Sequence, residues 1–133
     1  MGLFGCGPAV VALTTGLPLP IIAAAIVRGG ADPEAIRPSE LALAYTKLGW
    51  RMSAVAWWSK RCSGPTVAAW AQVTPWIERG TQFVALVEDP ARDGCHWIAV
   101  RDEMAADSLS GGEWLPVAHC KWLIRSIWRI EPG

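Results

Sequence analysis

Apolar side chains occupy every position from residue 8 to residue 13, so the first segment of the chain has no polar face. Pro8 suits the first turn of a helix, and Gly16 is a typical end signal. The pattern predicts a helix over residues 6–15. A helix that is apolar on every side is typical of a central, buried position. A second short helix is predicted over residues 20–27.

Leu41, Tyr45 and Leu48 recur at helical spacing and form one apolar face. Ser39 is a good N-cap for this segment, because its hydroxyl can accept a free backbone N–H of the first turn. Gly49 is the expected end signal. The third predicted helix therefore runs from Ser39 to Leu48.

The rest of the chain is rich in β-branched and aromatic residues separated by turn signals, which favours strands. Helices come before a mostly antiparallel sheet, so we predict an α+β fold rather than alternating βαβ units. The length of 133 residues suits one domain over residues 1–133. The first strand is expected to set Trp50, Met52, Ala54, Ala56 and Trp58 on a single face. Strands are predicted over residues 50–58, 83–87, 96–100, 105–109 and 122–130, with one more short helix over residues 74–80.

The predicted turn at residues 101–104 decides which face of the sheet Asp107 occupies. A two-residue loop at 102–103 would set Asp107 opposite Ile98. Asp107 would then share the face of His96 and lie diagonal to it, at about 7–8 Å between Cα atoms. A three-residue loop would turn the Asp107 side chain to the other face, because alternate strand residues point in opposite directions.

The formal net charge is zero, and the twelve basic residues are scattered along the chain. This pattern is not that of a nucleic-acid-binding protein. Residues 9–27 approach the length of a membrane span, but Thr, Gly and Pro interrupt them, so no span is expected. The four Cys show no CxxC spacing, and the chain starts without the basic segment of a signal peptide. We expect a reduced, cytoplasmic protein. Signal-independent export, association with a virion or another assembly, and the oligomeric state are left open.

Cys6 is the first candidate for chemistry, because it begins the predicted buried helix. Unpaired N–H groups and the positive end of the helix dipole favour a thiolate there. The simpler alternative is that Cys6 is one small buried residue among many. A nucleophilic Cys needs a base, and the chain has two His, His96 and His119. His96 opens a predicted strand after a turn, so its ring can face a cleft, whereas His119 is expected to be structural.

The imidazole of His96 needs a third group that fixes its tautomer and stabilises its charged form. The chain contains no Asn, so this group must be an acid or the amide of Gln72 or Gln82. Asp107 is the candidate, provided that the turn has two residues. Its alternative role is to cap its own turn.

Three segments resemble the papain-like cysteine peptidases, and most closely the bacterial branch that processes bacteriocin leaders. Residues 5–9 (Gly-Cys-Gly-Pro-Ala) resemble the nucleophile motif, residues 94–100 (Gly-Cys-His-Trp-Ile-Ala-Val) the His strand, and residues 107–109 (Asp-Ser-Leu) the acidic end of the triad. The order Cys, His, Asp is also that of the family. The resemblance implies a papain-like α+β fold in a bacterial or phage protein. The nucleophile helix is expected to pack on the sheet.

The resemblance also implies a catalytic triad of Cys6 as nucleophile, His96 as general base and acid, and Asp107 as orienting group. The implied activity is that of a thiol protease or amidase, which cleaves an amide or peptide bond through a thioester. The substrate would be a peptide or protein, and no cofactor or metal is implied.

The sequence departs from the family at the oxyanion hole. Members carry a Gln shortly before the nucleophile, and residues 1–5 contain none. The Cys6 backbone N–H can supply one donor, and Gln72 or Gln82 is a candidate for the second. The alternative function is therefore a catalytically inactive papain-like module that binds a partner or serves a larger assembly.

Three further expectations concern cysteine and tryptophan residues. Cys95-His96 and His119-Cys120 are candidates for a zinc site, although adjacent strand residues point to opposite faces. Cys62 is expected to be an ordinary exposed thiol, and Cys95 and Cys120 to be buried and inert. Trp97 is expected in the core. Trp57, Trp58 and Trp114 are candidates for lining a substrate groove.

Overall fold

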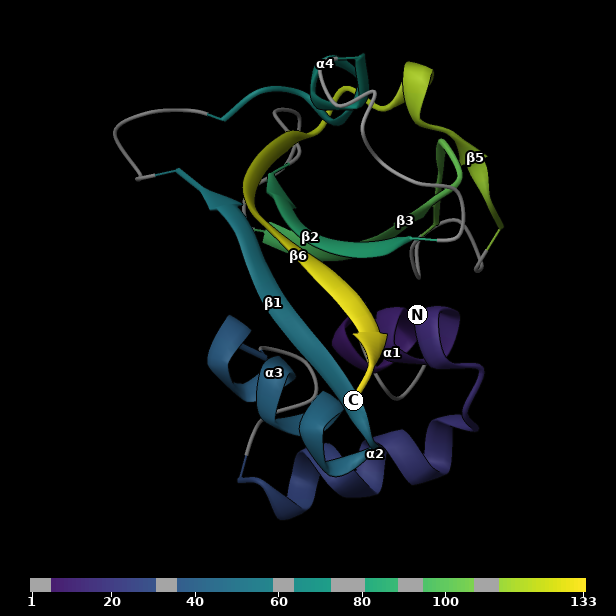
Figure 1. The fold of residues 1–133 in the computed structure, drawn as a ribbon, viewed down its shortest axis with the longest axis vertical. Coiled ribbons are helices and arrows are strands. Elements are labelled where there is room, and N and C mark those ends of the chain that lie inside the picture. Colours follow the sequence, from purple (N-terminus) through teal and green to yellow (C-terminus); the bar gives the residue numbers. More distant parts are fainter. Residues whose placement is uncertain (1–5, 31–35, 59–63, 73–80, 89–94, 107–112) are drawn as a thin grey trace.

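The computed structural model describes residues 6–30, 36–58, 64–72, 81–88, 95–106 and 113–133. Three helices come first along the chain, followed by a sheet in which every described strand pairing is antiparallel (Figure 1). The predicted α+β class is confirmed. The helices are α1 (Cys6–Thr15), α2 (Leu19–Arg28), α3 (Pro38–Lys47) and α4 (Val67–Gln72), with a 3-10 turn η1 (Val117–His119). The strands are β1 (Trp50–Trp57), β2 (Gln82–Glu88), β3 (Cys95–Arg101), β4 (Met104–Ala106), β5 (Leu115–Pro116) and β6 (Leu123–Pro132).

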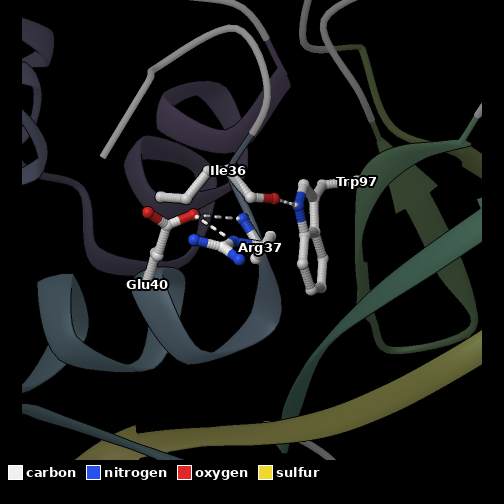
Figure 2. Close-up of polar contacts among 4 residues, drawn as sticks. All are labelled: Ile36, Arg37, Glu40 and Trp97. Atoms are coloured by element: carbon white, nitrogen blue, oxygen red, sulfur yellow. Dashed lines mark hydrogen bonds and ion pairs between the residues drawn. The ribbon is translucent and has the colours of Figure 1, made fainter. Parts of the chain in front are cut away.

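The bounds of α1 agree with the prediction, and Gly16 ends it in the left-handed conformation, at a φ of 74°. The start of α3 is a correction. The helix begins at Pro38, and its N-cap is Arg37 rather than Ser39. Ser39 lies inside the first turn, and the Glu40 carboxylate accepts the backbone N–H of the N-cap residue Arg37 at 3.0 Å (Figure 2). This backbone hydrogen bond lowers the pKa of Glu40.

The six strands lie in the order β1-β6-β2-β3-β4-β5, and their side chains build two cores, one on each face. The first three helices cover one face, while α4 lies on the other side of the sheet (Figure 1). We call the buried cluster under α1, α2 and α3 the helix-side core: Val10, Val11, Ile22, Ile26, Ile36, Leu41, Ala44, Tyr45, Val84, Trp97, Ala99 and Ile130. We call the opposite cluster the far-side core: Val67, Trp70, Phe83, Ala85, Val87, Ile98, Val100, Ala105, Val117, Ile124 and Ile127.

The first strand does not keep one face toward one core. Trp50 and Met52 pack on the helix-side core, whereas Ala56 and Trp58 pack on the far-side core. The pairing of β1 with β6 shifts register after Ala54. A bulge of this kind adds a residue to one strand and reverses the alternation beyond it. The prediction of a single face over residues 50–58 was therefore wrong beyond Met52.

Three elements on the far side were not predicted: α4, β5 and η1. The segment that leads into α4 crosses β6 closely. Ile124 donates its backbone N–H to the Pro65 carbonyl at 2.9 Å, and Thr66 bridges to Leu123. Gly64 lies so near this crossing that a Cβ atom would overlap the Ile124 carbonyl oxygen. The helix predicted over residues 74–80 lies outside the described residues.

Among the helices of the described residues, none is both long enough and apolar enough to cross a lipid bilayer.

Candidate functional site

Cys6 is the first residue of α1, the position that the sequence predicted for it. The helix packs against β3, the strand that carries His96. Gly7, Pro8 and Val10 are buried, so the start of the helix is enclosed by protein. The side chain of Cys6 itself lies outside what the structure describes. Cys6 therefore begins a buried helix that packs against the predicted histidine strand, at the helix end where the dipole favours an anion.

The turn between β3 and β4 has the two residues that the Asp107 prediction requires. Asp102 and Glu103 have φ values of 51° and 65°, the left-handed pair typical of a tight hairpin. The described register runs from Arg101↔Met104 to Ala99↔Ala106. Asp107 is the next residue along the chain and lies outside the described residues. Continuation of this register would set it opposite Ile98.

His96 is the second residue of β3 and is half-buried, with its Nε2 atom enclosed. Its cross-strand neighbour on β2 is Val87, a member of the far-side core. The imidazole meets the Trp122 ring edge-to-face, with 4.5 Å between ring centroids and 86° between planes. No sequence signal indicates Trp122 as a partner for His96. The described ring of His96 thus lies on the face of β3 opposite to the face that α1 covers.

The residue before His96 contradicts a prediction. Cys95 was expected to be buried and inert, but it is exposed, and Cys120 is partly exposed. The first residue of β3 lies at the end of the sheet, where no described element covers that side chain. The Cys95 Sγ lies 3.9 Å from Oε1 of Glu88 on β2, and Arg125 Nε on β6 lies 3.3 Å from the same oxygen. Cys95 is therefore an accessible thiol. Cys62 lies outside the described residues.

Gln72 and Gln82 were the two candidates for a side-chain donor in the oxyanion hole. Gln82 Nε2 donates to the Thr14 carbonyl at 2.9 Å, at the end of α1 far from Cys6. Its Oε1 atom lies 3.4 Å from a guanidinium nitrogen of Arg101. Gln82 is thus engaged at the C-terminal end of the helix, and the proposal that it completes an oxyanion hole at Cys6 was wrong. The side chain of Gln72 lies outside the described residues.

The exposure and contacts of the tryptophan side chains test their predicted roles. Trp97 is 1% exposed, and its Nε1–H donates to the Ile36 carbonyl at 3.1 Å, which confirms its place in the core (Figure 2). Trp57 is 73% exposed at the end of β1. Trp114 carries the Arg101 guanidinium over its ring at 4.5 Å. Trp57 thus offers an exposed aromatic surface, whereas the Trp114 ring is partly occupied by Arg101.

Within the described residues, no three His, Cys, Asp or Glu side chains gather into a metal site. The zinc alternative would need Cys95 and His96 together. Cys95 is exposed at the end of β3, whereas the ring of His96 packs against Trp122 on the far side of the sheet. The side chain of His119 is outside the description.

Comparisons with protein-family models, with curated proteins and with solved structures found no match. Function is therefore inferred from the residues of this chain.

Proposed function

We propose that the chain is a cysteine hydrolase of papain-like type that cleaves an amide or peptide bond. Cys6 is the nucleophile, His96 the general base and acid, and Asp107 the orienting group. The observation that carries the proposal is the position of Cys6 as the first residue of a buried helix packed against β3. The two-residue turn adds support, because the hairpin register it sets would bring Asp107 to the face of His96.

In the proposed reaction, the Cys6 thiolate attacks the carbonyl carbon and forms a C–S bond. The C–N bond breaks as the His96 imidazolium gives its proton to the leaving amine. The neutral imidazole then takes a proton from water, and the resulting hydroxide attacks the thioester, which releases the acid and regenerates the thiolate. The Cys6 backbone N–H supplies one oxyanion donor. Without a side-chain donor in the oxyanion hole, kcat is typically lower by ~10²–10³-fold.

The position of the His96 ring favours a second candidate function, a catalytically inactive module that binds a partner. A general base must come within hydrogen-bond reach of the proton that it takes, about 2.6–3.2 Å between heavy atoms. The His96 ring instead packs on Trp122, on the face of β3 away from α1. Catalysis requires the imidazole to leave Trp122 and reach Cys6 around the start of the strand. Exposed Trp57 would serve the binding function.

Selective alkylation distinguishes the two functions without a known substrate. Brief iodoacetamide labelling at pH 6, followed by peptide mapping, should modify Cys6 before exposed Cys95 and before Cys62. A thiolate stabilised by an imidazolium and a helix N-terminus reacts at a pH where ordinary thiols remain protonated. His96→Ala should remove most of this advantage, and His119→Ala is the matched control that should keep it. Faster labelling of Cys95 or Cys62, or unchanged Cys6 labelling in His96→Ala, would establish the binding module instead.

A further inference from the structure

The helix that carries Cys6 packs through a surface that is almost entirely apolar. Apolar contacts alone do little to determine the rotation of this helix or its position along its axis. Pro8 to Leu13 are all apolar, and Val10 and Val11 are fully buried in the helix-side core. Hydrophobic contacts of about the right size tolerate more than one rotation or shift of a packed helix. A single buried polar contact can fix the register of helices that apolar packing leaves undetermined. The polar groups of α1 therefore decide where Cys6 is held.

The polar groups of α1 gather at its C-terminal end. Thr14 is 4% exposed, and its Oγ1 lies 2.9 Å from the Val10 carbonyl and 2.6 Å from the Tyr45 hydroxyl on α3. The threonine hydroxyl has one proton, and the Val10 carbonyl can only accept it. The consistent arrangement is that Thr14 donates to Val10 while Tyr45 donates to Thr14. This contact joins α1 to α3 in a fully buried position.

A second contact joins the same turn of α1 to the sheet. The Thr14 carbonyl belongs to the last turn, where helix carbonyls have no partner within the helix. Gln82 Nε2 donates to it at 2.9 Å from the start of β2. Gln82 is itself held from the other side by Arg101, whose guanidinium stacks on Trp114. One turn of α1 is thus fixed to α3 and to β2 by directional bonds.

We propose that Thr14, Tyr45 and Gln82 are positioning residues that set the place of Cys6, and we call them the C-terminal lock. This inference rests on the proposed function. Cys6 lies eight residues before Thr14, about 12 Å along the same helix. If the helix moves as one body, a shift or rotation at Thr14 displaces Cys6 by the same shift or rotation. Misplacement of a reacting group by ~1 Å can slow a reaction ~10²-fold. The lock acts on the nucleophile from the opposite end of the helix.

The test compares two threonine variants with the same chemistry. Thr14→Val removes the lock hydroxyl and keeps the side-chain shape. Thr46→Val is the matched control, because the Thr46 hydroxyl on α3 bonds the Ala42 carbonyl in the same local way but is exposed. The readout is the pH midpoint of Cys6 alkylation by iodoacetamide, with exposed Cys95 as the internal reference. Urea unfolding of each variant is measured in parallel.

Thr14→Val should raise the Cys6 midpoint by about one pH unit, which is a roughly tenfold lower thiolate fraction at a pH well below both midpoints. Tyr45→Phe and Gln82→Met should also raise the pH midpoint of Cys6 alkylation. These two variants test the C-terminal lock if Thr14→Val fails to fold. Thr46→Val should leave the midpoint unchanged. A purely structural role predicts lower urea midpoints with an unshifted Cys6 midpoint, and that result overturns the lock alone. A wild-type Cys6 that titrates like Cys95 overturns the proposed function and the positioning role together.

Discussion

The two faces of the sheet are held by different means. On the helix side, three helices pack on the sheet, and buried directional bonds fix them: Thr14 to Tyr45, and Trp97 to the Ile36 carbonyl. On the far side, the cover that the structure describes is α4 and η1. Backbone hydrogen bonds tie α4 to the segment before β6, from Val67 N–H to the Trp122 carbonyl and from Ala68 N–H to the Cys120 carbonyl. The helix side is thus held by buried side-chain hydrogen bonds, whereas the described cover of the far side is held by backbone hydrogen bonds to a neighbouring segment.

This difference bears directly on the candidate site. Cys6 belongs to the fixed face through α1, and the described ring of His96 belongs to the far side through Trp122. If the triad operates, the face held by buried side-chain hydrogen bonds supplies the nucleophile and the opposite face supplies the base. Variants on each face test this contrast.

Trp97→Ala should have the largest effect, because it removes a fully buried ring and the hydrogen bond to Ile36. We expect a loss of about 3–5 kcal/mol in the free energy of unfolding, measured by urea denaturation. Trp70→Ala is the comparison on the far side, where the ring packs edge-to-face on Phe83 at 5.4 Å. Its loss should be smaller, because α4 can detach while the sheet stays folded. Equal losses in the free energy of unfolding would show that α4 unfolds together with the rest of the protein and does not detach first.

Gly64→Ala tests the tightest point of the far side. A Cβ at this position overlaps the Ile124 carbonyl oxygen, so one of the two segments must move. The expected loss is about 1–3 kcal/mol by urea unfolding. Gly29→Ala at the end of α2 is the control, since its Cβ would lie 3.4 Å from the nearest atoms and its φ is −77°. Wild-type stability in Gly64→Ala would mean that α4 and its approach adapt freely.

Tyr45 makes the helix side sensitive to alkaline pH. Burial raises the pKa of Tyr45 above its ordinary value, against a smaller opposing effect of the Thr14 hydrogen bond. Below pH ~10 both the folded and unfolded states keep the phenolic proton, so its contribution to stability is complete. Above that pH the unfolded state loses the proton first, and stability should fall by about 1.4 kcal/mol per pH unit up to the folded pKa.

Tyr45→Phe should remove this alkaline slope while costing about 1 kcal/mol at neutral pH for the lost hydrogen bond. Tyr45 is the single tyrosine of the chain, so tyrosinate absorbance reports on this residue alone. Ionisation of the folded protein at the ordinary pH would show that water reaches the helix-side core.

The β3–β4 turn should give the smallest effect, and a favourable one. Asp102 and Glu103 both occupy the left-handed region, which Asn and Gly adopt more readily. Replacing the pair by Asp102→Asn and Glu103→Gly should raise the free energy of unfolding by about 0.5–1 kcal/mol. The same change should leave Cys6 labelling unchanged, because it preserves the hairpin register. A lower stability would show that the turn side chains make contacts that offset the backbone strain.

The sequence was informative wherever one local signal dominated. Gly16 and Pro8 indicated the bounds of α1. The length of the turn after Arg101 was left open between two and three residues, and the structure has two. The cap of α3 was misassigned because the helix already begins at Pro38, which suits the first turn, and Glu40 accepts the backbone N–H of the N-cap residue Arg37. The reversal of faces along β1 has no composition signal, since a bulge changes alternation without requiring a particular residue.

The face of His96 could not be predicted for a different reason. Both sides of β3 are apolar: Trp97 and Ala99 point to one core, and Ile98 and Val100 to the other. A strand buried on both faces shows no alternation that would indicate which face receives the helices. That choice is made by tertiary packing, when the Trp97 indole reaches the carbonyl of Ile36 on the segment leading into α3.

The close approach at Gly64 sets a rule for sequence divergence. A side chain is excluded there by a backbone oxygen, which every amino acid at position 124 would present, so no change at Ile124 can compensate for the loss of glycine. A distant descendant that keeps the two segments at this spacing must also keep glycine, whereas one with another residue there must shift one of the two segments. A search pattern that requires this glycine at a suitable distance after a Cys-Gly-Pro helix start would therefore separate true relatives from chance matches to that tripeptide.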